Sequence, residues 1–423
     1  MITARVLIHA IFASASVALA SGCGAQPRLF STQSYYLSGD TMYIRPGRYL
    51  VSTPIRLPAV RVIEGAGAEF SVPADSRTSI MEIVDRSDLK VSSLTFSLSE
   101  QIDNSRSPEA YGQYNHHYLV VLRRASRVEF SDCTFRNALG TTLHITDSRD
   151  IRIRGCAFRD LGATTYPGRV NYSYDGIFVG GYGASSGIEI TGCEFTNIGQ
   201  QWPRSGESAN DGDGIQLQSA GSLQDVIIQD CHFTACSARG VKVMGGSDIR
   251  ILNNRFTRCR NPINFAMTQP VRGALVRGNR MEDCKLPIQS DCVTGTPSVD
   301  RLEIVGNEID TCYGFLRTSG ASRMSRVLIA DNRIGSIHQY FAEGRFLGAT
   351  FRGNVVDSYG AETRWGYHHA LYLNPESVDV HIVDNIFTRA RPGSDTIIVK
   401  TSAPIEMRGN EFPLRDYQRP ERH

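Results

Sequence analysis

The chain has 423 residues, with 45 Lys and Arg against 43 Asp and Glu. A net charge of only +2 excludes a generic nucleic-acid-binding protein, which needs a basic excess to neutralise phosphates. Apolar residues make up 41% and charged residues 21%, a composition that excludes a chain disordered throughout. This length predicts two or more domains, unless one repetitive architecture accounts for the whole chain.

Residues 1–22 have the pattern of a targeting segment, with Arg5 followed by an apolar run. The sequence Ala-Leu-Ala at 18–20 fits a signal-peptidase site. Alternatively, Ala-Ser-Gly-Cys at 20–23 resembles a bacterial lipobox, which would make Cys23 a lipidated first residue and a membrane anchor. Both interpretations predict export, either to the periplasm, outer membrane or cell surface as a lipoprotein, or by secretion. One acyl chain anchors only marginally, so stable attachment would need further acylation.

The rest of the chain repeats one short unit, as in VEFSDCTF, IRIRGCAF, IRILNNRF and VHIVDNIF. Each unit carries a Cys or Asn at the same place, which we call the marker. The markers are Cys133, Cys156, Cys193, Cys231, Asn254, Asn279, Asn307, Asn332, Asn354, Asn385 and Asn410. After several markers a second short strand follows, as in Asp-Gly-Ile-Phe-Val at 175–179. Fixed-period self-similarity of this kind predicts a solenoid whose coils bury their apolar faces by stacking.

The units resemble the coils of the right-handed parallel β-helix found in pectate lyases, polygalacturonases and phage tailspikes. The resemblance predicts an all-β, single-stranded solenoid of about 11–13 coils. We expect an N-terminal segment over 23–44, the β-helix domain over 45–415 and a polar tail over 416–423. The fold hosts many chemistries, so it does not fix an activity. The resemblance to tailspikes leaves a trimer open.

The cysteines support this repeat register. Four are markers, and four more lie five residues after consecutive markers: Cys236, Cys259, Cys284 and Cys312. Equivalent positions of a solenoid stack roughly 4.8 Å apart, so we expect two internal cysteine ladders continued by an asparagine ladder. Buried cysteines that act as small apolar side chains are the favoured interpretation. Stacked asparagine amides would satisfy backbone groups in the turns.

Long insertions precede some of the second strands, and they contain the two Trp residues, Trp202 and Trp365. Residues 97–117, 157–178 and 195–216 are therefore expected to form a groove on one side of the solenoid. Loops on a rigid scaffold commonly carry function. Flat amphipathic rings beside polar groups suit stacking against a sugar, although the same rings could simply pack the loops down.

Aligning the second strands on their Gly produces two columns of polar residues. One column runs His117, Thr141, Asp175, Asp213, Arg239, Asn261, and the other runs Val120, His144, Phe178, Gln216, Lys242, Asn264. The columns predict catalytic roles for Lys242, Arg239, Asp213 and Asp175. Together with aromatic residues of the insertions, they predict substrate binding by His117, His144, Gln216, Trp202, Tyr174 and Asn264. The alternative is a solvated face whose charges serve solubility alone.

Elimination from a uronate is the favoured chemistry. It needs a base for the C5 proton and positive charge, or Ca²⁺, to stabilise the developing enolate. Lys242 would be the base and Arg239 the carboxylate clamp. Asp175, Asp211 and Asp213 could bind Ca²⁺, since hard oxygen ligands suit that ion. No other cofactor is expected. The predicted partner is an acidic polysaccharide, and no nucleic acid is expected.

Three other functions remain open. Paired carboxylates at Asp175 and Asp213 could hydrolyse a glycoside. By resemblance to polygalacturonases, Asp175 occupies a catalytic position, whereas Gly212 and Arg239 replace an acid and a histidine of that family. C5 epimerisation shares the proton abstraction step, but the Asp-Pro-His type of motif associated with solenoid alginate epimerases is absent. A non-catalytic polysaccharide-binding or cell-surface scaffold protein is the alternative outside enzymes.

Overall fold

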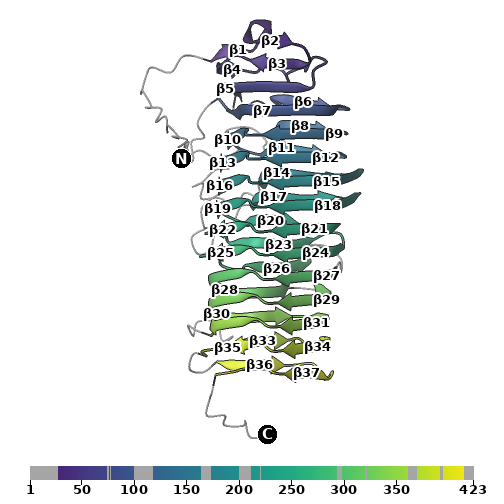
Figure 1. The fold of residues 1–423 in the computed structure, drawn as a ribbon, viewed down its shortest axis with the longest axis vertical. Coiled ribbons are helices and arrows are strands. Elements are labelled where there is room, and N and C mark those ends of the chain that lie inside the picture. Colours follow the sequence, from purple (N-terminus) through teal and green to yellow (C-terminus); the bar gives the residue numbers. More distant parts are fainter. Residues whose placement is uncertain are drawn as a thin grey trace, which may run out of the picture.

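A computed structural model describes residues 27–73, 76, 78–99, 118–162, 173–199, 211–219, 221–292, 298–319, 322–360, 369–390 and 394–413. These residues form 37 strands and one 3-10 helix within a single hydrogen-bonded network. The strands stack coil upon coil along one long axis, from β1 at one end to β37 at the other (Figure 1). The all-β solenoid predicted from the repeat is therefore confirmed.

Each regular coil contributes a strand to three parallel sheets. The first sheet holds the strand that precedes the marker, and its outward side chains alternate with buried ones, as in the Ile151 and Ile153 pair. Its strands are β3 (Thr41–Ile44), β9 (Ser126–Ser131), β12 (Arg149–Arg154), β15 (Ala184–Thr191), β18 (Ser222–Gln229), β21 (Gly246–Leu252), β24 (Val271–Arg277), β27 (Ser298–Val305), β29 (Arg323–Ala330), β31 (Phe346–Arg352), β34 (Val378–Val383) and β37 (Ile405–Arg408).

The second sheet holds the short strand that follows the marker. Its strands are β1 (Arg28–Leu29), β4 (Gly47–Leu50), β10 (Thr134–Ala138), β13 (Ala157–Leu161), β16 (Glu194–Ile198), β19 (His232–Cys236), β22 (Arg255–Thr257), β25 (Arg280–Glu282), β32 (Val355–Ser358) and β35 (Ile386–Phe387). Two long strands, β5 (Val62–Val72) and β7 (Ser87–Leu98), bend from the first sheet into the second.

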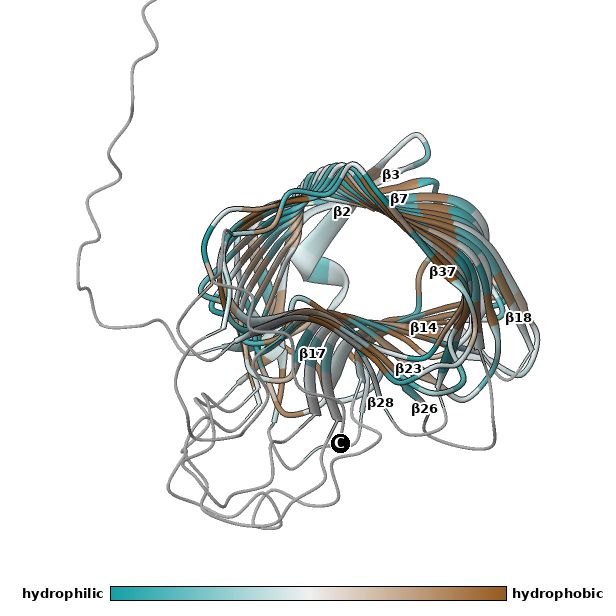
Figure 2. Ribbon diagram, turned by 90° about the horizontal axis from the view of Figure 1, so that it is seen from below, coloured by the Kyte–Doolittle hydropathy of each residue, from teal (hydrophilic) through white to brown (hydrophobic). Residues whose placement is uncertain are grey.

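The third sheet carries the strands predicted to present the polar columns. They are β6 (Met81–Val84), β8 (Tyr118–Arg123), β11 (Thr141–Thr146), β14 (Ser173–Gly181), β17 (Asp211–Ser219), β20 (Arg239–Val243), β23 (Asn261–Met267), β26 (Ile288–Cys292), β33 (His369–Leu373) and β36 (Asp395–Val399). The long strands β28 (Glu308–Ser319) and β30 (Arg333–Gly344) run from the second sheet into the third. Viewed along the axis, the three sheets enclose the core (Figure 2).

Stacked side chains fill the core. The rings of Phe135, Phe158, Phe195, Phe233 and Phe256 lie one above another, with neighbouring centroids 4.6–4.8 Å apart. All five side chains are fully buried. Burial of such large apolar side chains, at about 1.5–3 kcal/mol each, is the main force that holds one coil on the next. A single coil could not bury these rings by itself.

The markers stack in the turn between the first and second sheets. From Asn254 to Asn410, each Nδ2 donates to the Oδ1 of the next marker at 2.8–3.0 Å. The Oδ1 of each of these asparagines, including Asn410, also accepts a hydrogen bond from the backbone N–H of the preceding marker, so buried turn groups are paired. The cysteine markers continue the ladder, and the backbone N–H of Cys231 donates to Asn254 Oδ1 at 2.9 Å.

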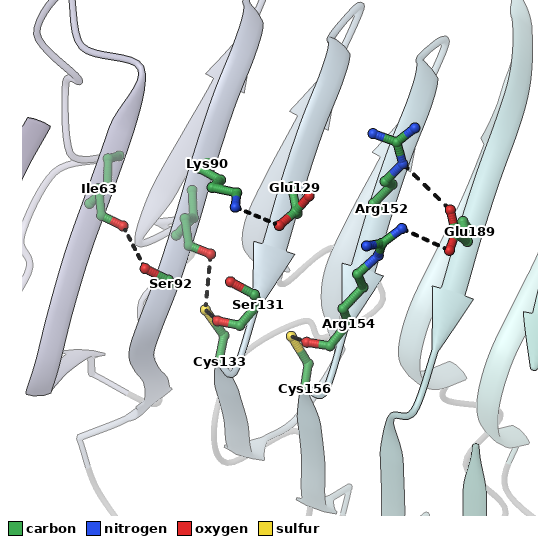
Figure 3. Close-up of polar contacts among 11 residues, drawn as sticks. Ile63, Lys90, Ser92, Glu129, Ser131, Cys133, Arg152, Arg154, Cys156 and Glu189 are labelled. Atoms are coloured by element: carbon green, nitrogen blue, oxygen red, sulfur yellow. Dashed lines mark hydrogen bonds and ion pairs between the residues drawn. The ribbon is translucent and has the colours of Figure 1, made fainter. Parts of the chain in front are cut away.

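Eight cysteine side chains lie in the described part of the chain. All eight are buried, and none forms a disulfide there. The thiols of Cys133 and Cys156 instead point at strand carbonyls beside the marker turn (Figure 3). The two predicted cysteine ladders are both present, because Cys284 and Cys312 also pair across adjacent coils. The cysteines thus act as small apolar side chains, as the repeat register indicated.

The N-terminal end is closed by residues 27–44. A 3-10 helix, η1 (Thr32–Ser34), leads into an antiparallel pair of β2 (Tyr35–Ser38) with β3. Phe30 packs edge-on against Phe70 at 5.2 Å between centroids, so it covers the last apolar layer. This cap protects the core and the exposed strand edges at that end. In the portion of the chain with described coordinates, no helix has the length and apolarity needed to cross a membrane.

Candidate functional site

The third sheet places the predicted polar columns on adjacent strands. Asp175 of β14 is in register with Asp213 of β17, and Asp213 is in register with Arg239 of β20. On the second column, Gln216, Lys242 and Asn264 are likewise register partners on consecutive strands. The solenoid thus brings together residues that are 22–38 positions apart in sequence. Neighbouring strands lie roughly 4.8 Å apart, which makes direct contact between these side chains possible.

Glycines set the path of these strands. A Cβ added to Gly176, Gly214 or Gly240 would lie 2.6–2.9 Å from the Phe ring of the neighbouring sheet and 2.6–2.7 Å from a backbone oxygen of the next coil. No side chain fits there without displacing the stacked rings. The Gly that follows Asp175, Asp213 and Arg239 is therefore required by close packing. It fixes where those three side chains emerge.

Asp213 lies at the centre of the cluster and is fully buried. Its Oδ1 is 3.5 Å from Arg239 Nη1, and its Oδ2 is 3.4 Å from Lys242 Nζ. Lys242 Nζ also donates to Gln216 Oε1 at 3.2 Å. A buried carboxylate is tolerated only when its charge is compensated, and here two cations from the next strand compensate it. Because the Arg239 side chain is 23% exposed and that of Lys242 only 8%, Arg239 is the cation that meets solvent.

Asp175 is buried and accepts a hydrogen bond from Thr141 Oγ1 at 3.0 Å. The residue in register with Thr141 on the preceding strand is Tyr118, whereas the sequence alignment placed His117 there. The same shift puts Val121, in place of Val120, in register with His144. The alignment was wrong by one residue because β8 follows a long insertion and has Leu119 at the position of the Gly on which the strands were aligned. A shift of one residue reverses the face of every side chain. Val120 is accordingly buried in the core.

Tyr118 is a site residue that the sequence analysis missed. Burial, and secondarily the charge of Asp175, raises the pKa of its phenol. Its ring lies 4.0 Å from that of His144, which in turn packs edge-on against Phe178 at 4.8 Å. An aromatic and imidazole surface of this kind adjoins the charged cluster, and it offers flat, amphipathic rings to a ligand.

On the other side of the cluster an open pocket of about 250 Å³ is lined by Ala238, Arg239, Arg260, Asn261, Asn264, Gln289 and Asp291. Asn264 Nδ2 and Gln289 Nε2 donate to the two oxygens of Asp291, at 3.0 and 2.8 Å. Asn264 Oδ1 is buried and has no hydrogen-bond partner within the described coordinates. The sequence analysis did not predict Arg260 as a site residue. Its position directly after Cys259, a member of the cysteine ladder, could have indicated that it lies beside the third sheet.

Several predicted site residues lie outside what the structure describes. They are His117, Trp202 and Cys23, together with the side chains of Tyr174 and Asp211. In the described ranges, no group of three or more His, Cys, Asp and Glu side chains is arranged to hold a metal ion. Calcium favours six to eight oxygen ligands. Asp213 already faces two cations, so its surroundings do not suit a calcium ligand. Calcium binding stays a prediction.

The chain belongs to the family described as the right handed beta helix region, whose model matches residues 111–201 and 169–356. The right-handed parallel β-helix inferred from the repeat is therefore confirmed. No curated protein matches the sequence.

Solved structures show the same fold at low sequence identity. The mannuronan C-5 epimerase AlgE6 A-module of Azotobacter vinelandii is 11% identical, with a TM-score of 0.53 over 90% of this chain and 92% of that chain. The catalytic unit of a GH87 α-1,3-glucanase from Streptomyces thermodiastaticus is 14% identical, with a TM-score of 0.52 over 89% and 64%. The surface adhesin PfbA of Streptococcus pneumoniae is 12% identical, with a TM-score of 0.51 over 76% and 85%. At such identities the likeness establishes the fold alone.

Proposed function

We propose that this protein is an exported enzyme that cleaves an acidic, uronate-containing polysaccharide by β-elimination. The observation that carries the proposal is the arrangement of cations about Asp213. Arg239 and Lys242 emerge side by side from β20, and Arg239 and Arg260 line the adjoining pocket. Positive charge held in a partly buried cluster attracts a carboxylate and stabilises the negative charge that develops on it.

In this mechanism Arg239 binds the uronate carboxylate, because it is the more exposed cation of the pair. The neutral amine of Lys242 takes the C5 proton, the C4–O bond breaks, a C4=C5 double bond forms, and the leaving oxygen gains a proton from water. Asp213 contacts both cations and acts as a positioning residue. Because the base in this mechanism is a neutral amine, activity should rise as Lys242 loses its proton.

Hydrolysis is the second candidate, and one observation favours it. Asp175 and Asp213 are register partners on adjacent strands, a spacing of roughly 4.8 Å that is close to the carboxyl separation of retaining glycosidases. Against it, Asp213 is fully buried and faces two cations, an arrangement that leaves its oxygens poorly placed to reach a sugar. The solved structures with this fold include an α-1,3-glucanase, a mannuronan C-5 epimerase and an adhesin, so an epimerase and a non-catalytic binder stay as further alternatives.

The proposal also includes export through residues 1–22 and, with the lipobox pattern, anchoring through Cys23. Mass spectrometry of the N-terminal peptide from the exported protein would test this. A lipid-modified Cys23 supports anchoring, and an unmodified residue 21 as the first residue supports secretion. Analytical ultracentrifugation of the same protein would decide between a monomer and the trimer that the tailspike resemblance left open.

A panel of polyuronates, with Ca²⁺ or with a chelator, tests the chemistry. The ultraviolet absorbance of the unsaturated uronate and the appearance of new reducing ends are followed together. Elimination produces both signals, and both are lost in Lys242→Ala but kept in Lys90→Ala, a surface lysine paired with Glu129. Reducing ends without absorbance would overturn elimination in favour of hydrolysis. A chelator that leaves the rate unchanged would remove calcium from the proposal.

A further inference from the structure

Several exposed charged side chains that the structure describes on the first and second sheets form ion pairs across neighbouring coils. Lys90 pairs with Glu129, and Arg152 and Arg154 pair with Glu189 (Figure 3). Arg255 pairs with Glu282 of the next coil in the same way, and Arg280 pairs with Glu282 within its own strand. Such exposed pairs contribute little to stability and neutralise the outer face.

Two cations beside the third sheet lie next to like charges. Arg260 is half-buried, and among the described residues neither Arg260 nor Lys285 is in an ion pair. Burial, and then the like charge of Arg239, lowers the pKa of Arg260. Burial, and then the charge of Arg260, lowers the pKa of Lys285. Like charges crowded at a partly desolvated surface are unfavourable unless an anion binds between them.

The backbone sets these residues in one line. Leu286 N–H donates to the carbonyl of Arg260 at 3.0 Å, and Tyr313 N–H donates to the carbonyl of Lys285 at 2.9 Å. Arg260, Lys285 and Tyr313 therefore hold the same place in consecutive coils, directly after the ladder of Cys259, Cys284 and Cys312. From the coil of Arg239 to that of Tyr313 is three strand spacings, about 14 Å, which suits an oligosaccharide better than a single sugar.

An aromatic ring ends this line. Lys285 Nζ lies 5.8 Å from the centroid of the Tyr313 ring, and the Tyr313 hydroxyl accepts a hydrogen bond from Gln339 Nε2. Tyr313 is half-buried, so one part of the ring is anchored and the rest meets solvent. A fixed ring beside a cation can stack against a sugar while the cation binds that sugar's acidic group.

We infer that Arg239, Arg260, Lys285 and Tyr313 form an anion-binding track that holds a chain of an acidic polysaccharide along the solenoid axis. The track extends from the proposed catalytic cluster toward the C-terminal coils, and it supplies binding sites separate from the reacting bond. The choice of a polysaccharide rests on the proposed function, but binding along the track does not require cleavage. The acidic group is a carboxylate or a sulfate ester, since both satisfy guanidinium and ammonium donors.

Isothermal titration calorimetry on the exported protein tests the track. The ligands are oligogalacturonates of defined length, dextran sulfate, neutral dextran and a single-stranded DNA, each at low and physiological salt. The Lys242→Ala protein replaces the wild type wherever cleavage is detected. The test variant is Arg260→Ala/Lys285→Ala, and the matched control is Arg255→Ala/Arg280→Ala, which removes the same charge from the second sheet of the same coils. Tyr313→Leu tests the ring without a change of charge.

The track predicts that the test variant binds an acidic oligosaccharide at least about tenfold more weakly than the control variant. Tyr313→Leu should weaken binding at both salt concentrations, and neutral dextran should not bind. Binding of dextran sulfate alone would identify a sulfate ester as the acidic group and would still support the track. Equal affinity in the test and control variants would overturn it, and so would DNA binding as tight as sugar binding.

The outcomes separate this inference from the proposed reaction. A chain that binds oligogalacturonate through Arg260 and Lys285, yet produces no absorbance, retains the track and refutes elimination. A chain that cleaves but binds equally well in both double variants retains elimination and refutes the track. Circular dichroism confirms that each double variant keeps its β-sheet spectrum, so a folding defect would be recognised.

Discussion

Lys242 Nζ lies 3.4 Å from Asp213 Oδ2, on the neighbouring strand and 29 positions away in the chain. The pair is held almost entirely out of water, since Asp213 is fully buried and the Lys242 side chain is 8% exposed. Arg239 approaches the other oxygen of the same carboxylate. One acidic side chain thus fixes two cations at the surface of a rigid sheet, which is the feature on which the proposed reaction depends.

Removal of Asp213 should destabilise the protein strongly. In Asp213→Ala, Lys242 remains buried without its counter-charge, and breaking a buried pair in this way costs about 3–5 kcal/mol. Denaturant unfolding followed by circular dichroism measures the free energy of unfolding. Asp225→Ala, which removes the partner of the exposed Arg250, is the control and should change it little. Equal effects of the two substitutions would contradict the buried ion pair.

Gly212 stands where polygalacturonases carry one of their acids, and the packing explains why no side chain is present. A Cβ at this position would lie 2.6 Å from Gly199 Cα and 2.8 Å from the Ile198 carbonyl oxygen. Gly212→Ala should therefore lower the melting temperature by several degrees, since backbone atoms would have to move. Thermal unfolding checks this. A melting temperature equal to that of the wild type would contradict the close contact of Gly212 with Gly199 and Ile198.

Substitution of an asparagine at the centre of the ladder should lower the free energy of unfolding more than substitution of the asparagine at its end. Asn307→Ala would leave the buried Val276 carbonyl and Asn279 N–H without their partner, which costs about 2–4 kcal/mol. Asn410→Ala is the matched control, because Asn410 ends the ladder and is half-buried. Chemical denaturation should show a clearly smaller loss for the control. Similar losses of unfolding free energy in the two variants would mean that the contribution of an amide does not depend on its burial or its position in the ladder.

His381 provides a prediction for pH. Hydrogen bonds to Glu406, and then to Asp379, raise the pKa of its imidazole above the ordinary value near 6.5. A raised folded pKa means that the contribution to stability is present below about pH 6.5 and is lost as pH rises through the folded pKa. Nuclear magnetic resonance should record a titration midpoint above 6.5 that falls in Glu406→Gln. An unchanged midpoint in that variant would contradict the contact. The effect on stability is small, because the pair is exposed.

The fold was predictable from local pattern. Three features of the sequence each specify one position of a coil. They are the alternation of apolar side chains in segments such as IRIRGCAF, the Cys and Asn markers, and the Gly before the apolar run of the third-sheet strand. The structure places these residues in the core, the marker turn and the packed glycine column. Such patterns can be recognised in the sequence because the same physical requirement recurs in every coil.

The site was predictable in part. The register of Asp175, Asp213, Arg239 and Lys242 followed from aligning the Gly after Asp175, Asp213 and Arg239, although long insertions precede β14 and β17. The position of Tyr118 did not, because the insertion before β8 hides a shift of one residue. The contact of Asp291 with Asn264 joins residues whose strands carry no shared motif. The line from Arg260 to Tyr313 follows the cysteine ladder, but the sequence does not show how deeply these side chains are buried.

The sequence by itself determined the solenoid, its repeat and which residues face inward, because those properties depend on periods of two residues and of one coil. The tertiary structure alone decided which outward side chains meet, how deeply Asp213 is buried and which cations have no carboxylate beside them. Those properties depend on the strand register across long connections and on the sum of all neighbouring groups, and neither quantity is encoded in any single segment.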